Sequence, residues 1–245
     1  MVRIAVEIPT ADGRSNATLH VPDGSGPWPG VVMFPDAGGA RQTFWDMGDH
    51  LAAMGYVVLV PDVYYRNEGW EPFSMATAFT DEGERSRLFS LMRTLSKDRI
   101  IADAGSYLDF LLGREEVRGT TAGTTGYCMG GRMSIIAAGE LPDKVGAAAS
   151  FHGGRIAVAD DPESPHLAAP RMRAKIYVAG ADKDDSYTPE EAELLESALT
   201  EAGVDHKLEI YLALHGFAVP DNPTHDAAAE ARHWEALAEL YGRAL

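Results

Sequence analysis

The chain begins with two segments in which apolar and polar residues alternate. Their apolar members are Val2, Ile4, Val6 and Ile8 in the first segment and Ala17, Leu19 and Val21 in the second. A period of two residues is typical of strands that are buried on one face. The pattern therefore predicts an antiparallel pair of strands, half exposed, at the start of the chain.

Six short apolar runs without strict alternation follow this pair. They are GVVMF (30–34), YVVLV (56–60), TAGTTGY (121–127), VGAAASF (145–151), AKIYVA (174–179) and KLEIYL (207–212). Parallel strands covered on both faces show this pattern, because neither face needs polar residues. The runs predict a second, larger group of parallel strands.

Helical spacing of apolar residues appears between several of these runs. The stretch 86–112 is too long for one simple helix, and a break into two is expected. Thr188 and Glu191 form a capping box with Pro189 at the first helical position, which predicts a helix through about Thr200. A last apolar stripe spans 227–241. Strands alternating with helices predict an α/β fold with a doubly wound, mostly parallel sheet.

The size and composition of the chain narrow its class. At 245 residues and 26.4 kDa it is long enough for one well-buried core, and no linker-like segment divides it, so residues 1–245 are expected to form a single domain. The net charge of −16 opposes binding to nucleic acid or to an anionic membrane. The first residues lack the features of a signal peptide, and a cytoplasmic location is expected.

The only cysteine, Cys128, lies in the glycine-rich stretch GTTGYCMGGRM (123–133). It follows a predicted strand and precedes a predicted helix, where α/β folds place their sites. A sharp turn of this kind needs neighbours without side chains, and Gly126, Gly130 and Gly131 meet that need. The pattern favours a nucleophilic thiol over the alternative of a small buried apolar residue.

A thiol nucleophile needs a base and a group that orients the base. In the α/β-hydrolase layout the order along the chain is nucleophile, acid, histidine, with the acid and the histidine after later strands. Asp182, the first carboxylate of GADKDD, and His215 of HGF meet this order. Asp184 and Asp185 are possible substitutes for Asp182.

The remaining candidate residues are a second histidine and two backbone donors. His152 also lies at a predicted strand end, but a structural role is the better interpretation for it. The layout requires two backbone N–H donors for an oxyanion, and Ala37 and Met129 are the candidates. No H-E-x-x-H or H-x-x-E-H spacing is present, so the sequence gives no support to a zinc site, and no metal is expected.

The segments GYCMGG, VVMFPDAGG, VPDVYYR, GADKDD and HGF, in this order, resemble the dienelactone hydrolase family. The resemblance covers nearly the whole chain and implies the α/β-hydrolase fold and a Cys-His-Asp triad. It makes Cys128 the nucleophile, His215 the general base and Asp182 the group that orients the base. It also implies that Asp36, where the family typically has glutamate, helps to activate the thiol when substrate binds.

The resemblance also implies substrate-binding residues. Arg85 fits the position of a family arginine that holds the carboxylate of the lactone. Phe89 stands where a tyrosine is expected, and Val219 stands where a second arginine is expected. Aromatic residues before Arg85 are candidates for an apolar pocket: Tyr64, Tyr65, Trp70, Phe73 and Phe79.

The function expected from the sequence is hydrolysis of an ester or a lactone, without a cofactor, through a thioester on Cys128. A carboxylesterase or thioesterase of another substrate class is an alternative. A redox-sensing thiol on a hydrolase scaffold is another, but His215 and Asp182 in triad order argue against it. A glutamine-amidotransferase-like enzyme ranks last, because no H-x-E pair follows Cys128. The expected partner is a small ester or lactone; the sequence does not determine the oligomeric state.

Overall fold

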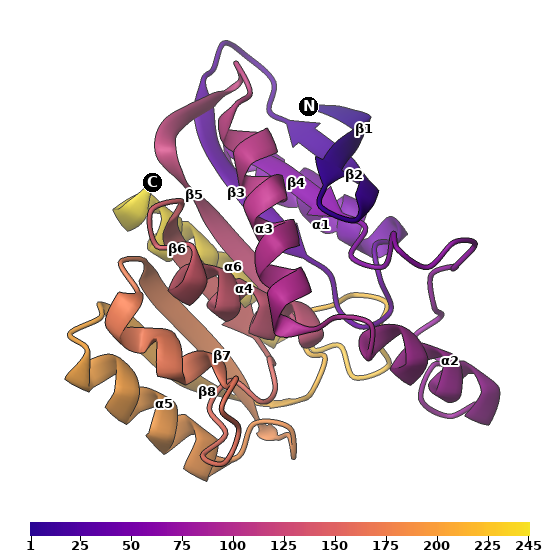
Figure 1. Cartoon of the computed structure of the whole chain (residues 1–245), viewed down its shortest axis with the longest axis vertical. Coiled ribbons are helices and arrows are strands. Elements are labelled where there is room, and N and C mark those ends of the chain that lie inside the picture. The colour runs from indigo at the N-terminus through magenta and orange to yellow at the C-terminus, as the bar shows by residue number, and fades with distance from the viewer.

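A computed structural model describes residues 1–245 and has one eight-stranded sheet with helices on both faces (Figure 1). The strands are β1 (Val2–Thr10), β2 (Gly13–Val21), β3 (Trp28–Phe34), β4 (Val57–Pro61), β5 (Val117–Tyr127), β6 (Val145–Phe151), β7 (Lys175–Lys183) and β8 (His206–Leu214). The helices are α1 (Gln42–Ala53), α2 (Glu82–Met92), α3 (Lys97–Leu112), α4 (Met129–Glu140), α5 (Pro189–Glu201) and α6 (Ala227–Ala244), with a 3₁₀ helix, η1 (Pro165–Arg171).

The strands lie in the order β1-β2-β4-β3-β5-β6-β7-β8. β1 pairs antiparallel with β2, and β2 pairs antiparallel with β4. All pairs from β4 to the far edge at β8 are parallel. The predicted antiparallel start and the mostly parallel doubly wound sheet are therefore confirmed, and every one of the six apolar runs contributes to a strand.

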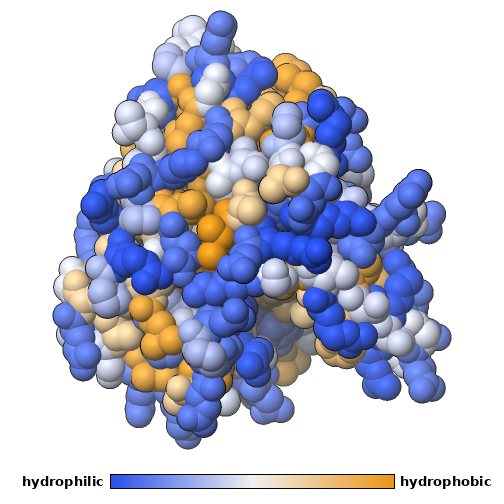
Figure 2. Space-filling model, viewed as in Figure 1, coloured by the Kyte–Doolittle hydropathy of each residue, from blue (hydrophilic) through white to orange (hydrophobic).

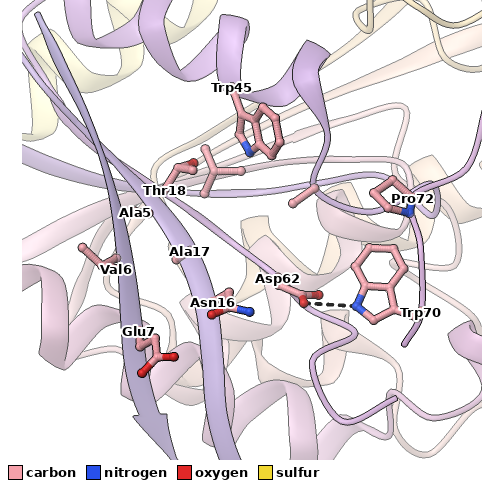
Figure 3. A pocket seen from close by; sticks show the side chains of 12 residues that line it. Ala5, Val6, Glu7, Asn16, Ala17, Thr18, Trp45, Asp62, Trp70 and Pro72 are labelled. Carbon is pink, nitrogen blue, oxygen red and sulfur yellow. Dashed lines mark hydrogen bonds between the residues drawn. The ribbon is translucent and has the colours of Figure 1, made fainter. Parts of the chain in front are cut away.

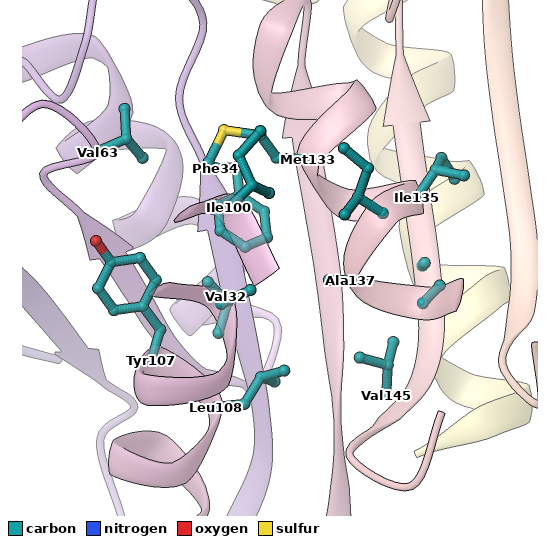
Figure 4. Close-up of a cluster of buried hydrophobic side chains, with 14 of the residues drawn as sticks. Val32, Phe34, Val63, Ile100, Tyr107, Leu108, Met133, Ile135, Ala137 and Val145 are labelled. Carbon is teal, nitrogen blue, oxygen red and sulfur yellow. The ribbon is translucent and has the colours of Figure 1, made fainter. Parts of the chain in front are cut away.

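Two layers of helices bury the two faces of the sheet. α3 and α4 pack on one face, with α5 on the same side, and α1 and α6 pack on the other. Figure 4 shows part of the first layer, where Tyr107 of α3 and Met133 of α4 meet Val32 and Phe34 of β3. These side chains are almost fully buried, which explains why the central strands read as continuous apolar runs.

The predicted helix boundaries follow from local capping. The stretch 86–112 is divided between α2 and α3, and the side chain of Ser96 caps the second helix by accepting the Arg99 N–H. Thr188 caps α5 by accepting the Glu191 N–H, with Pro189 in the first turn, as its sequence predicts.

α2 and the loop before it lie apart from the sheet and the helices that cover it. In Figure 1 they project beyond the main body, and Figure 2 shows them as a lobe with mostly hydrophilic outer residues and a hollow beside it. None of the helices combines the length and the apolar character that crossing a membrane requires.

Candidate active site

Cys128 lies in the tight turn between β5 and α4 and has a strained backbone, with φ 53° and ψ −117°. A Cβ on Gly126 would lie 1.9 Å from the Gly130 carbonyl oxygen, and a Cβ on Gly130 would lie 2.3 Å from the Phe34 carbonyl oxygen. Atoms cannot approach this closely, so both positions require glycine. The turn holds the side chain of Cys128 partly exposed at the carboxyl end of a central strand, where the sequence predicts it.

His215 follows β8 and points its Nδ1 at Asp184, which follows β7. The Nδ1–H donates to Asp184 Oδ2 at 2.7 Å, and this carboxylate is almost fully buried. Asp184 Oδ1 accepts from the backbone N–H and the hydroxyl of Ser186 at 2.9 and 2.6 Å. The bond on Nδ1 fixes the tautomer and leaves Nε2 free to take a proton.

The expectation that Asp182 orients His215 is corrected by this geometry. Asp182 is still part of β7 and its side chain is exposed, whereas Asp184 lies one residue beyond the strand and turns inward. The sequence named Asp184 only as a substitute, because the strand end could not be placed to the residue.

The surroundings of His215 favour its protonated form. Burial opposes the charged form of His215, but interactions with the Cys128 sulfur and the Asp184 carboxylate outweigh it and raise the pKa of His215 to about 10. Burial likewise opposes ionisation of Asp184, yet its hydrogen bonds to His215 and Ser186 hold its pKa below the usual value.

The two backbone donors predicted for an oxyanion lie at the same cavity. Met129 opens α4, and Ala37 lies in the loop after β3; neither amide donates to a protein acceptor. The hydroxyl of Tyr64 donates to the Ala37 carbonyl at 3.1 Å and contacts the Met129 sulfur at 3.4 Å. Tyr64, which the sequence suggests as a pocket residue, is fully buried and links the loop of Ala37 to the start of α4.

Asp36 does not contact the thiol. Its Oδ1 accepts from the Gly38 N–H and from Arg41, its Oδ2 accepts again from Arg41, and the side chain is buried. Arg41 also donates to Asp221 in the loop beyond His215. In this structure both carboxylate oxygens of Asp36 shape the loop that carries Ala37, and activation of the thiol by Asp36 when substrate binds stays a prediction.

A cavity of about 440 Å³ opens over Cys128 and His215. Its lining consists of Ala37, Phe79, Phe89, Met92, Cys128, Met129, Arg132, Gly154, Arg155, Asp184, Asp185, Ser186 and His215. Phe89 and Phe79 line it, as the sequence predicts. Arg85 is exposed and does not line it, although it lies one helical turn before Phe89 on α2. That expectation is corrected.

Two arginines that the sequence did not single out line this cavity. Arg132 lies four residues after Cys128 in the first turns of α4, and Arg155 lies in the loop after β6. One carboxylate, that of Asp161, lies 3.7 Å from each guanidinium. Val219, at the place of the second family arginine, is fully buried and cannot bind a substrate.

A second cavity, of about 550 Å³, lies over β1 and β2 between Trp45 and Trp70 (Figure 3). Trp70 Nε1–H donates to Asp62 at 3.1 Å. Neither Cys128 nor His215 borders this cavity. The expectation that Trp70 lines the pocket at Cys128 is therefore wrong. The same holds for Tyr65 and Phe73, which do not line that pocket either.

The site contains no obvious metal centre, since no group of three or more His, Cys, Asp or Glu side chains is placed to hold an ion. The sheet topology and the strained strand-to-helix turn at Cys128 define an α/β-hydrolase fold. The chain belongs to the dienelactone hydrolase family, whose model matches residues 16–245. It is accordingly a hydrolase of ester or lactone bonds.

Similar proteins cover nearly the whole chain. A Synechocystis protein named "Putative carboxymethylenebutenolidase" is 28% identical over 241 residues, which are 96% of this chain and 94% of that protein. A metagenomic dienelactone hydrolase-like promiscuous phosphotriesterase superposes with a TM-score of 0.78 at 25% identity, covering 100% of this chain and 99% of the other. The dienelactone hydrolase of Anabaena variabilis gives a TM-score of 0.67 at 20% identity, with 100% and 98% covered.

Proposed function

We propose that this protein hydrolyses an ester or a lactone, without a cofactor, through a thioester on Cys128. His215 is the general base and Asp184 orients it. The observation that carries the proposal is the 2.7 Å hydrogen bond from His215 Nδ1 to Asp184 Oδ2. It lies at the same cavity as the partly exposed side chain of Cys128. A nucleophile, a base and an orienting group in mutual reach are what acyl transfer requires.

In the first half of the reaction His215 Nε2 holds the proton of the Cys128 thiol. The thiolate attacks the carbonyl carbon, and the oxygen becomes an oxyanion that the amides of Ala37 and Met129 stabilise. When the C–O bond breaks, the imidazolium gives its proton to the leaving alkoxide. An ester releases an alcohol, whereas a lactone opens and keeps its hydroxyl on the acyl chain.

In the second half a water molecule attacks the thioester. His215 Nε2 takes a proton from the water, a second oxyanion forms, and the C–S bond breaks to release the carboxylic acid and the Cys128 thiolate. The proton on His215 then restores the resting ion pair. Asp184 stays ionised throughout and stabilises the imidazolium.

The cavity suggests the kind of substrate. Phe79, Phe89 and Met92 offer an apolar wall for a ring or an aliphatic acyl group. Arg132 and Arg155 carry cationic groups on the same cavity and suit a polar or anionic substituent. We therefore propose small esters or lactones with an apolar body, and an acidic substituent held by Arg155 in place of Arg85.

The test is intact-mass analysis after brief incubation with p-nitrophenyl acetate and, separately, with a dienelactone. The wild type is expected to show a transient acyl adduct, and Cys128→Ala none. His215→Ala is expected to lose the product burst. Turnover at the wild-type level in Cys128→Ala would contradict the proposal. A sulfenic acid on mild oxidation, without any acyl adduct, would favour the redox-sensing thiol instead.

A further inference from the structure

His152 lies directly after β6, beside the turn that carries Cys128. Its side chain is almost fully buried, and its backbone has a φ of 41°. Only two other non-glycine residues, Cys128 and Arg155, have a positive φ, and both line the active-site cavity. Such backbone conformations persist only where surrounding contacts hold them, and they gather at active sites.

The imidazole of His152 is bonded to the backbone of the nucleophile. Its Nδ1 accepts from the Cys128 N–H at 3.1 Å, and the same N–H also donates to the Phe151 carbonyl at 3.0 Å. The N–H of His152 donates to the Ala179 carbonyl at 2.8 Å, which fixes the residue to β7. An accepting Nδ1 carries no proton, so the proton lies on Nε2, which is buried without a hydrogen-bond partner.

The same ring contacts the base. The centroids of the His152 and His215 rings are 5.0 Å apart at an interplanar angle of 63°, and Phe217 packs against His152 at the same distance. Burial, and then the charge of His215, lowers the pKa of His152 well below the ordinary value; Asp184 opposes this, and the nearby His233 adds to it. The ring therefore stays neutral and keeps Nδ1 available as an acceptor.

We propose that His152 is a positioning residue for the acyl transfer: its Nδ1 anchors the Cys128 amide and so aims the sulfur and the adjoining Met129 amide at the substrate. It acts through Cys128 and does not touch the substrate. The inference rests on the proposed roles of Cys128 and His215. Without the anchor, the Cys128 N–H keeps only its bond to the Phe151 carbonyl, and the strained turn is less firmly held.

Two substitutions separate the acceptor from the bulk of the ring. In His152→Asn the side-chain carbonyl can accept near the position of Nδ1, and asparagine tolerates a positive φ. In His152→Phe the ring remains and the acceptor is lost. We expect His152→Phe to lower kcat about tenfold with KM within about twofold, and His152→Asn to stay within about threefold of the wild type.

A second measurement does not depend on any ester. The rate of Cys128 alkylation by iodoacetamide is followed from pH 5 to pH 9, with thermal unfolding of each variant alongside. We expect the profile of His152→Phe to move to higher pH, because the sulfur is less well held against the His215 imidazolium, and that of His152→Asn to match the wild type. A role confined to stability would lower the melting temperature and leave both profiles unchanged.

Wild-type kcat and an unmoved alkylation profile in His152→Phe would overturn the proposal. So would equal losses in both variants, since the acceptor would then be irrelevant. If the Phe variant does not fold, His152→Gln replaces it, because its longer side chain moves the acceptor away from the Cys128 amide; wild-type kcat there would also overturn the proposal. If the wild-type enzyme hydrolyses no ester, only the proposed function is contradicted. The alkylation profiles still test the role of His152.

Discussion

At the scale of single residues, the acid of the site is selected by where a strand ends. Successive side chains of a strand alternate between faces, so Asp182 and Asp184 differ only in whether the chain still follows β7. β7 ends at Lys183, and the turn that follows brings Asp184 onto His215 and lets Ser186 hold its other oxygen.

Asp184→Asn is expected to lower kcat/KM by about 10²–10³, because the amide cannot stabilise the imidazolium and offers Nδ1 a donor as readily as an acceptor. Asp182→Asn, two residues away and exposed, is the matched control and is expected to stay within about twofold. Steady-state kinetics with p-nitrophenyl acetate measure both. Equal effects in the two variants would remove Asp184 from its proposed role.

At the scale of elements, the nucleophile turn depends on how closely α4 approaches the sheet. Gly130, in the first turn of α4, lies against the ends of β3, with the carbonyl oxygens of Phe34 and Pro35 at 2.3 and 2.4 Å from where a Cβ would be. Both neighbours are backbone atoms, of the last residue of β3 and of the residue after it, and cannot shift without moving the strand end. α4 can therefore pack this closely against the sheet only because Gly130 has no side chain.

Gly130→Ala is expected to destabilise the protein by about 1–3 kcal/mol, the usual result of overpacking a tight contact, and to disturb the Met129 amide. Gly105→Ala in α3 is the control, because a Cβ there meets nothing within 4 Å. It is expected to stabilise by about 0.5–1 kcal/mol through helix propensity. Chemical denaturation checks both signs, and a stable Gly130→Ala would contradict the account of the turn.

The packing of α6 against β5 depends on a neutral histidine. His233 accepts the Tyr127 hydroxyl at Nε2 and donates from Nδ1 to the Glu230 carbonyl, both at 2.9 Å. Burial lowers the pKa of His233 to about 3. Because the folded pKa lies below the unfolded value of about 6.5, its stabilising contribution is complete above that value and is lost as the pH falls toward 3.

From this difference we expect His233 alone to remove about 2 kcal/mol of stability between pH 7 and pH 5, at about 1.4 kcal/mol per pH unit below 6.5. His233→Gln keeps a donor and an acceptor but does not titrate, so the stability of this variant should fall less over the same range. Urea unfolding at several pH values makes the comparison. Parallel curves for the two proteins would show that His233 does not contribute.

At the scale of the whole molecule, the active-site cavity joins segments that lie far apart in the sequence. Phe79 and Phe89 come from the lobe around α2, whereas His215 and Arg155 come from the carboxyl ends of the sheet. We therefore expect the substrate specificity to depend on how the lobe around α2 faces the sheet. Within α2 itself, Phe89 lines the cavity and Arg85 does not.

Arg155→Ala is expected to raise KM about fivefold for an ester that bears a carboxylate, such as p-nitrophenyl hemisuccinate, with little change for p-nitrophenyl acetate. The Arg155 guanidinium is exposed, so solvent screening keeps its hydrogen bond to the carboxylate weaker than a buried charge-assisted one. Arg85→Ala is the control and is expected to change neither value, because Arg85 lies outside the cavity lining. A larger effect of Arg85→Ala would restore the assignment suggested by the sequence.

The sequence by itself determined the succession of strands and helices along the chain, the turn at Cys128 and the position of His215 after a strand. Each of these depends on a local pattern of apolar spacing or glycine. The tertiary structure decided the contacts between distant segments. It selected Asp184 over Asp182, bound Asp36 to Arg41, and brought Arg155 to the cavity in place of Arg85. The partner of a side chain depends on the residue at which each strand ends and on how the loops pack. Neither produces a periodic pattern in the sequence.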